Sequence, residues 1–436
     1  MATTVMATTV TATTTGGVRS RVGRRRVSTT TTTTTTMRGV VFEGEVRHGR
    51  RTSTLGWQRV KRTSTTTTTT TTTRAMEKDE SSSPSSNEMS QQRFDARTFD
   101  AKIEDLANLG LTRALREVDA RLERAMRGEA ASTSTTNDAD GGDKVRMDGE
   151  MAEREAVDLM ACLRQRGEIK AFGAAHNVPK RDYALAELRL NGIEAEKLLA
   201  PTESTIKGIR DNFTRVFGLA YVAGLYFLHP TFAQGAGTAA FAAFCATYDQ
   251  VAFGGGVSAL VFDTVAQSTS KEYVTRLRRH EAAHFLTAYL IGILPKGYTL
   301  SSLDAFKTYG ALNIQAGCAF CDGEFQREVQ KGKITSTSLG RFACVAMAGI
   351  CMEYILFGFA EGGLSDVQQL DGLLRALAFS QKKSDSEVRW AVLNTTALLR
   401  RHVGVTEKLA DAMARGASVG ECVTLIETEV QKAELV

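Results

Sequence analysis

Two histidines lie four residues apart in the stretch Arg279–Leu286, which reads RHEAAHFL, and a glutamate directly follows the first. On an α-helix, residues i and i+4 share one face, so both imidazoles can reach one metal ion. This HExxH spacing is typical of zinc-binding helices, where the glutamate takes a proton from metal-bound water. His280 and His284 are therefore candidate Zn²⁺ ligands, and Glu281 is the candidate general base. The alternative is a core helix whose histidines are only hydrogen-bonded polar groups.

The residues around this stretch predict one helix of about six turns. Thr269 followed by Glu272 forms a capping box at its start, and Gly292 and Pro295 supply stop signals. Apolar residues recur at helical spacing between these ends: Val274, Leu277, Phe285, Ala288 and Ile291. A catalytic zinc site usually takes three protein ligands, so a third ligand is expected further along the chain.

Two later stretches resemble the second half of the peptidase domain of the FtsH family, whose members are membrane-anchored zinc proteases. They are Met347–Gly358, MAGICMEYILFG, and Gly362–Val367, GGLSDV. In that family a helix with an acidic segment ends at Phe-Gly, and an aspartate that follows is the third zinc ligand. The resemblance implies a mainly α-helical zinc-peptidase domain with a small β element, covering residues 268–436.

The resemblance also implies roles for individual residues. It makes Asp366 the third zinc ligand beside His280 and His284. Glu281 keeps the role of general base, and Glu353 falls at an acidic position of the helix before the third ligand.

The chain around Asp366 favours this assignment on physical grounds. Gly362 and Gly363 interrupt the preceding structure, so Asp366 is expected at a helix N-terminus, where the helix dipole stabilises an ionised carboxylate. The alternative is that Asp366 is only an N-terminal cap. Asp371 and Glu361 are the fallback ligands.

The first 75 residues have the composition of an organellar transit peptide. They include the threonine runs Thr29–Thr36 and Thr65–Thr73, and they carry 13 basic but only two acidic residues. The abundance of hydroxyl side chains favours the chloroplast, at its thylakoid or envelope membrane, over the mitochondrion; an ordinary disordered tail is the alternative. Because the whole chain has a net charge of +5, the remainder carries −6, so no nucleic-acid partner is expected.

Three segments separate this N-terminus from the zinc-binding helix. Residues 76–95 are polar and predict a disordered linker, whereas residues 96–206 show leucines at helical spacing and predict a helical region without a catalytic constellation. Residues 207–267 predict a transmembrane or membrane-associated segment, because Val216–Tyr248 contains 33 residues without a charged side chain. One crossing or a helical hairpin fits this run, with a pair of buried helices as the alternative.

Two short strands are expected after the zinc-binding helix, at Lys296–Leu300 and Tyr309–Gln315. They could align an extended substrate by main-chain pairing or only form a hairpin that covers the core. The rest of the chain is expected to be helical, with starts at Ser384 and Ser418.

Seven cysteines do not suggest a secreted disulfide framework. Cys318 and Cys321 form a C-x-x-C pair, which could be a redox-switchable disulfide or two unrelated cysteines. The others are expected to be buried thiols: Cys162, Cys245, Cys344, Cys351 and Cys422.

These features together predict a zinc-dependent endopeptidase that acts on membrane or unfolded proteins of an organelle. The sequence contains no phosphate loop of the G-x-x-x-x-G-K-[ST] type, and the nearest string, at Gly332 and Lys333, lacks the leading glycine and the hydroxyl residue. The chain is therefore expected to work without ATP on its own or with an ATPase or FtsH-type partner subunit. Alternatives are a proteolytically inactive FtsH-like subunit with an assembly or chaperone-like role, or a scaffold led by residues 96–206.

Overall fold

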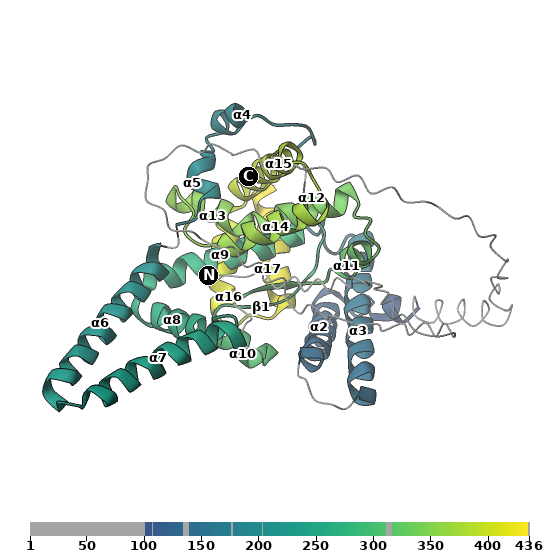
Figure 1. The fold of residues 1–436 in the computed structure, drawn as a ribbon. Coiled ribbons are helices and arrows are strands. Elements are labelled where there is room, and N and C mark those ends of the chain that lie inside the picture. The colour runs from purple at the N-terminus through teal and green to yellow at the C-terminus, as the bar shows by residue number, and fades with distance from the viewer. Residues whose placement is uncertain are drawn as a thin grey trace, which may run out of the picture.

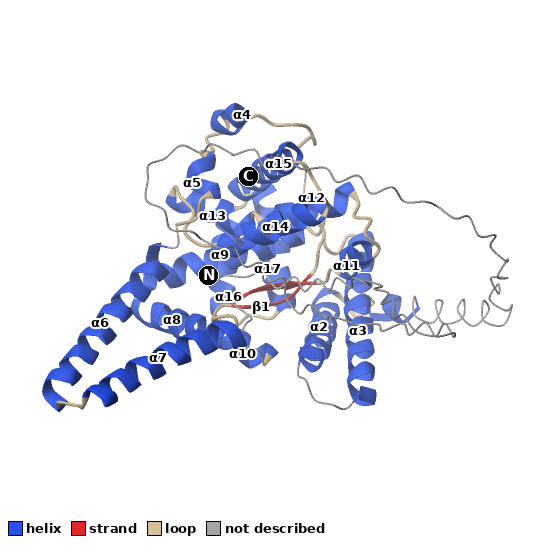
Figure 2. Cartoon of the chain, in the orientation of Figure 1, coloured by secondary structure: helices blue, strands red, loops and turns tan. Residues whose placement is uncertain are grey.

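The computed structural model describes residues 101–106, 108–133, 139–175, 178–202, 204–310 and 316–434. These residues are mainly helical, and the strands among them form one antiparallel two-stranded sheet (Figure 1, Figure 2). The predicted fold class is thus confirmed in its coarse form. The predicted transit peptide, residues 1–75, and the predicted linker, residues 76–95, lie outside the described residues.

The helix that carries the two histidines is α9, Lys271–Leu290. Its N-cap is Ser270, whose hydroxyl accepts a hydrogen bond from a backbone N–H in the first turn. The prediction of Thr269 as the cap is wrong, because Thr269 is the last residue of the preceding helix α8, Gly256–Thr269. After α9, Gly292 adopts a φ of +86°, a left-handed conformation that glycine takes without strain.

Helix α9 lies inside the main hydrophobic core, and all its residues from His280 to Leu290 are buried. The C-terminal helices that pack on it are α12 (Ser336–Ala346), α13 (Ala348–Phe357), α15 (Gln381–Arg401) and α16 (Val403–Ala414). Two more helices complete this part, α14 (Leu364–Ala376) and α17 (Val419–Glu434). The histidines of α9 are therefore held in a medium of low dielectric, where unpaired charge is costly.

The predicted helical region contains α2 (Leu111–Thr133), α3 (Ala139–Gln165), α4 (Leu185–Leu190) and α5 (Ala195–Leu199). Most of its buried apolar residues belong to the same hydrophobic cluster as α9 and the C-terminal helices. The carboxylate of Glu427 on α17 accepts hydrogen bonds from the backbone N–H groups of Lys170 and Ala171, in the segment after α3. It also accepts a hydrogen bond from the Tyr289 hydroxyl on α9, so it joins that segment to the core. This region therefore packs against the part of the chain that carries the two histidines.

The sheet pairs β1, Pro295–Thr299, with β2, Gly317–Phe320. The first predicted strand is confirmed, whereas Tyr309 belongs to helix α10, Ser302–Tyr309, and residues 311–315 lie outside the described residues. A helix forms there because the Ser301 hydroxyl caps its first turn. Both strands are largely buried, so they cover the core beside α9.

The C-terminal half is helical as predicted, beginning with α11 (Gly323–Gln330). The predicted start at Ser418 is confirmed, because Ser418 and Glu421 exchange capping hydrogen bonds before α17. The start predicted at Ser384 is wrong. Ser384 lies inside α15, whose N-cap is Ser380, and the Ser380 hydroxyl accepts the Lys383 N–H.

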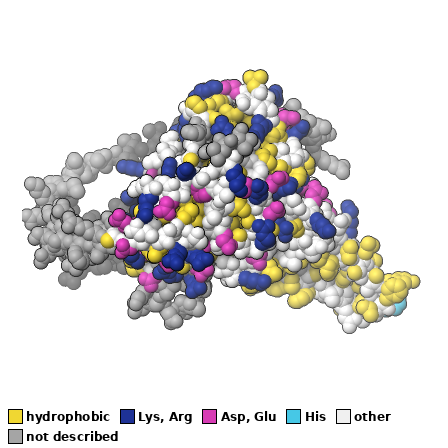
Figure 3. Space-filling view, turned by 180° about the vertical axis from the view of Figure 1, so that it is seen from behind, with side chains coloured by type: hydrophobic (Ala, Val, Ile, Leu, Met, Phe, Trp, Pro, Cys, Tyr) yellow, Lys and Arg dark blue, Asp and Glu magenta, His cyan; other side chains and the backbone are white. Residues whose placement is uncertain are grey.

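The charge-free run lies within two helices, α6 (Ser204–Leu228) and α7 (Phe232–Ala252), which project from the rest of the chain as a hairpin, here called the arm (Figure 1). Hydrophobic side chains gather along the arm in the space-filling view (Figure 3). By length and mean hydropathy, no single described helix meets the criterion for a membrane span, and one bent pair, α12 with α13, meets it.

Candidate metal centre

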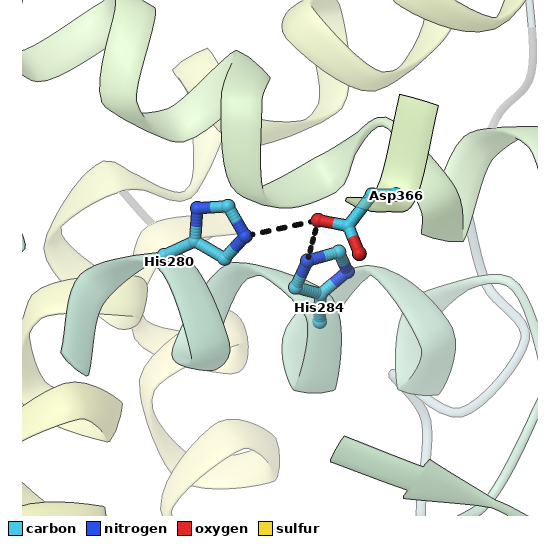
Figure 4. Close-up of side chains that lie close together, drawn as sticks. All are labelled: His280, His284 and Asp366. Atoms are coloured by element: carbon cyan, nitrogen blue, oxygen red, sulfur yellow. Dashed lines mark hydrogen bonds and ion pairs between the residues drawn. The ribbon is translucent and has the colours of Figure 1, made fainter. Parts of the chain in front are cut away.

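The structure brings together the three residues predicted as metal ligands. The Asp366 carboxylate, in the first turn of α14, has Oδ2 3.2 Å from His280 Nε2 and 3.4 Å from His284 Nε2 (Figure 4). One ligand atom from each residue lies within 4.8 Å of the others, and all three residues are buried. This buried group can hold a metal ion.

Hydrogen bonds at Nδ1 orient the two imidazoles so that the Nε2 atom of each one faces the centre. His280 Nδ1 lies 2.7 Å from Glu353 Oε1, and His284 Nδ1 lies 2.8 Å from the Val345 carbonyl oxygen. Both partners accept hydrogen bonds, so each Nδ1 is the N–H donor, and each Nε2 can bind a cation once it carries no proton. Metal-binding histidines are commonly oriented in this way by a carboxylate and a backbone carbonyl.

Several polar atoms around this centre are buried without a hydrogen bond from any described residue. They are both carboxylate oxygens of Glu281, Nε2 of His284 and Oδ1 of Asp366. Leaving such atoms unsatisfied costs about 1–3 kcal/mol each, and more when they carry charge. A cation with a bound water molecule would satisfy an imidazole nitrogen and carboxylate oxygens together, so the donor set fits a metal ion.

The carboxylates around His280 shift its protonation. Burial alone would lower the pKa of His280, but hydrogen bonds to Asp366 and Glu353 outweigh it and raise the pKa to about 10. Burial would likewise raise the pKa of Asp366, yet its contacts with His284 and His280 outweigh burial and lower the pKa to about 2. Without a metal, a proton on His280 therefore supplies the positive charge that these carboxylates require.

Glu281 is the fourth predicted site residue, and the structure places it beside the ligands on α9 with no exposed surface. Burial raises the pKa of its carboxyl. A raised pKa suits a general base, because it increases the affinity for the proton that the base must accept.

The fallback ligands lie elsewhere. Asp371 is half exposed and pairs with Arg375 one turn along α14, at 2.5 Å. Glu361 pairs with Arg276 and with the start of the arm. The N-cap of α14 is Gly363, and the Asp366 carboxylate points at the histidines, so Asp366 is more than a helix cap.

Sequence reasoning missed the glycines that make room for the ligands. A Cβ at Gly349 would lie 2.1 Å from His280 Nε2, the nitrogen that faces the centre. Gly363, with a φ of +82°, would place a Cβ 3.1 Å from the His280 ring and 3.2 Å from Asp366 Oδ2. Gly363 lies close to Asp366 in the sequence, but Gly349 is far from every predicted ligand, so the sequence did not reveal what either glycine approaches.

The C-x-x-C pair is not a disulfide in this structure. The Cys318 thiol is buried and donates to the main-chain oxygen of Glu281 at 3.3 Å, and burial together with the nearby Glu281 charge raises its pKa well above the usual range. Three of the cysteines predicted to be buried are so: Cys344, Cys351 and Cys422. The prediction is wrong for Cys245, which is exposed on the arm, and Cys162 is half-buried.

Comparisons with protein-family models, with curated proteins and with solved structures give no match for this chain. The assignment of the site therefore depends on the contacts and chemistry of its own residues.

The replacement Gly349→Ala is expected to weaken zinc binding by roughly 100-fold or more, because the added methyl group occupies the position of the metal-facing nitrogen of His280. Equilibrium competition with a chelating dye measures the affinity. Gly404→Ala on α16 is the matched control, since its Cβ would meet no atom within 4 Å. Equal zinc affinity in both variants would contradict the ligand geometry.

Zinc binding at pH 7.5 is expected to release about one proton, because the pKa of about 10 keeps His280 protonated until the metal displaces that proton. The apparent zinc affinity should then rise roughly tenfold per pH unit between pH 6.5 and 8. Calorimetry in two buffers with different ionisation enthalpies counts the protons. Zinc uptake without proton release would show that His280 is neutral in the metal-free protein.

Proposed function

We propose that the chain is a zinc-dependent endopeptidase. His280, His284 and Asp366 would hold Zn²⁺, since two imidazoles and a carboxylate are a ligand set typical of catalytic zinc. The observation that carries the proposal is the pair of unpartnered Glu281 oxygens buried beside the three ligands. The nearby Cys318 thiol donates to the main-chain oxygen of Glu281, so the two buried carboxylate oxygens are left for a proton or a water molecule.

The residues around the centre support hydrolysis of a peptide bond. Bound zinc would lower the pKa of a water molecule to about 7. Glu281 would accept a proton from that water as its oxygen adds to the substrate carbonyl carbon, and would pass the proton to the departing amine nitrogen as the C–N bond breaks. Glu353 and the Val345 carbonyl would keep the two imidazoles oriented throughout.

A proteolytically inactive subunit is the second candidate. The observation that favours it is the burial of the site, because Glu281 has no exposed surface and a peptide cannot contact it in this conformation. Such a subunit would retain the metal ion as a structural element and would act by binding other proteins at its surface. Bound zinc without any turnover would support this candidate.

The arm supports a further proposal, that the protein is attached to a membrane. Large apolar side chains are exposed at nine of the 13 positions of α6 between Val216 and Leu228, and these positions are spread over all sides of a helix with 3.6 residues per turn. A protein partner would cover one face of such a helix, whereas lipid would surround it. The 13 residues span about 20 Å at 1.5 Å per residue. This is less than a hydrocarbon core of about 30 Å, so this part of α6 does not cross a bilayer by itself and the proposal is attachment.

Charge at the base of the arm agrees with this attachment. Lys207, Arg210 and Arg215 are exposed on α6 just before the apolar part, with Asp211 as the acid among them. An excess of basic side chains at that level favours a surface of anionic lipid headgroups. Localisation in the chloroplast depends on residues 1–75 and stays a prediction from the sequence.

The replacement Glu281→Gln is expected to leave zinc bound at one ion per chain and to lower the rate of casein cleavage by roughly 10²–10⁴-fold, because it removes only the general base. Zinc content and cleavage are measured on the same samples. Glu123→Gln, an exposed carboxylate on α2, is the control and should retain activity. Cleavage that persists in Glu281→Gln would contradict the proposed mechanism.

The protein is expected to float with vesicles that contain anionic lipid, and the pair of replacements Phe227→Asp and Phe232→Asp should abolish flotation. Both side chains are exposed near the tip of the arm, at 76% and 91%. Leu190→Asp on α4 is the matched control, since this leucine is 86% exposed outside the arm. A parent chain that stays in the bottom fraction would contradict attachment through the arm and leave the peptidase proposal intact.

A further inference from the structure

The first turn of α6, at the base of the arm, is hydrogen-bonded to a carboxylate near the metal centre. Glu361 lies in the loop between α13 and α14, and its Oε1 accepts hydrogen bonds from the Ser204 hydroxyl at 2.6 Å and from the Thr205 N–H. The first N–H groups of a helix have no partner within the helix, and they carry partial positive charge. Glu361 therefore supplies the cap of α6 from a distant part of the chain.

The other oxygen of Glu361 faces an arginine of α9. Glu361 Oε2 lies 3.3 Å from Arg276 Nε, one turn before His280, and Arg276 Nη1 lies 3.3 Å from Glu353 Oε2. The guanidinium is buried over the rings of Phe357 and Phe359. Packing as well as charge therefore holds the guanidinium between the two carboxylates, with an ion pair to Glu361 and a hydrogen bond to Glu353.

Glu353 makes the last contacts in this series, with the ligand His280 and with the loop before α14. Its Oε1 holds His280 Nδ1, and its Oε2 accepts the backbone N–H groups of Glu361 and Gly362 at 2.8 and 3.1 Å. The loop that these amides belong to leads directly into α14 and Asp366. One carboxylate therefore positions a ligand from α9 and the loop that delivers the ligand from α14.

We propose that the base of the arm and the metal centre form one coupled unit, with Glu361 as the positioning residue that joins them through Arg276 and Glu353. This rests on the proposed metal site but requires neither turnover nor a membrane. Coupling between two sites is reciprocal, so a metal ion that orders His280 and Glu353 also orders the start of α6. Conversely, whatever orders the arm strengthens metal binding by the same factor.

The test compares backbone hydrogen exchange in the full chain with and without zinc. In the parent, zinc is expected to slow exchange in the first turns of α6, residues 204–210, by about fivefold or more. The effect should vanish in Glu361→Gln and shrink in Ser204→Ala, which removes one part-buried hydrogen bond at an exposed residue and should keep the fold. Glu123→Gln, an exposed carboxylate on α2, is the matched control and should behave as the parent.

Zinc affinity and zinc content, measured on the same variants, separate failure of the coupling from failure of the metal site. Zinc affinity should fall about tenfold in Glu361→Gln, the effect typical of an outer partner of a metal ligand. Zinc bound at one ion per chain with unchanged exchange in α6 would overturn the coupling and leave the proposed function standing. A parent chain that binds no zinc would overturn both, and equal zinc protection of α6 in the parent and in Glu361→Gln would overturn the role of Glu361.

Discussion

Two carboxylates buried against one imidazole are the constraint on which the rest of the structure depends. Transferring a carboxylate into a protein interior costs several kcal/mol, so Asp366 and Glu353 must be matched by positive charge and hydrogen bonds. His280, Arg276 and the amides before α14 supply these partners. Atoms of Glu281, His284 and Asp366 stay without a hydrogen bond, and two of these three residues belong to the group that could hold a cation.

Much of the site could be predicted because its signals are local or carried by a strong motif. The spacing of His280 and His284 on one helix follows from helical geometry alone. Asp366 was expected from the family resemblance and from its place after two glycines, and the structure brings it to both histidines. The fold class was also predictable from a local signal, since helical periodicity extends over most of the C-terminal half.

What the sequence could not show are contacts between residues far apart in the chain. Gly349 approaches His280 across 69 positions, and Glu361 reaches the start of α6 across 157. Local choices between similar caps also failed: Ser270 rather than Thr269 starts α9, and Ser380 rather than Ser384 starts α15. Several hydroxyl residues near a helix start can each accept the same N–H, and tertiary packing decides between them.

The central claim is that one zinc ion is held by His280, His284 and Asp366. A crystal structure of the zinc-loaded chain, with diffraction collected on both sides of the zinc absorption edge, tests it most directly. The account predicts one anomalous peak about 2.0–2.1 Å from Nε2 of each histidine and about 2.0–2.2 Å from an oxygen of Asp366. A loaded crystal with no peak there, or with its zinc bound by other residues, would contradict it.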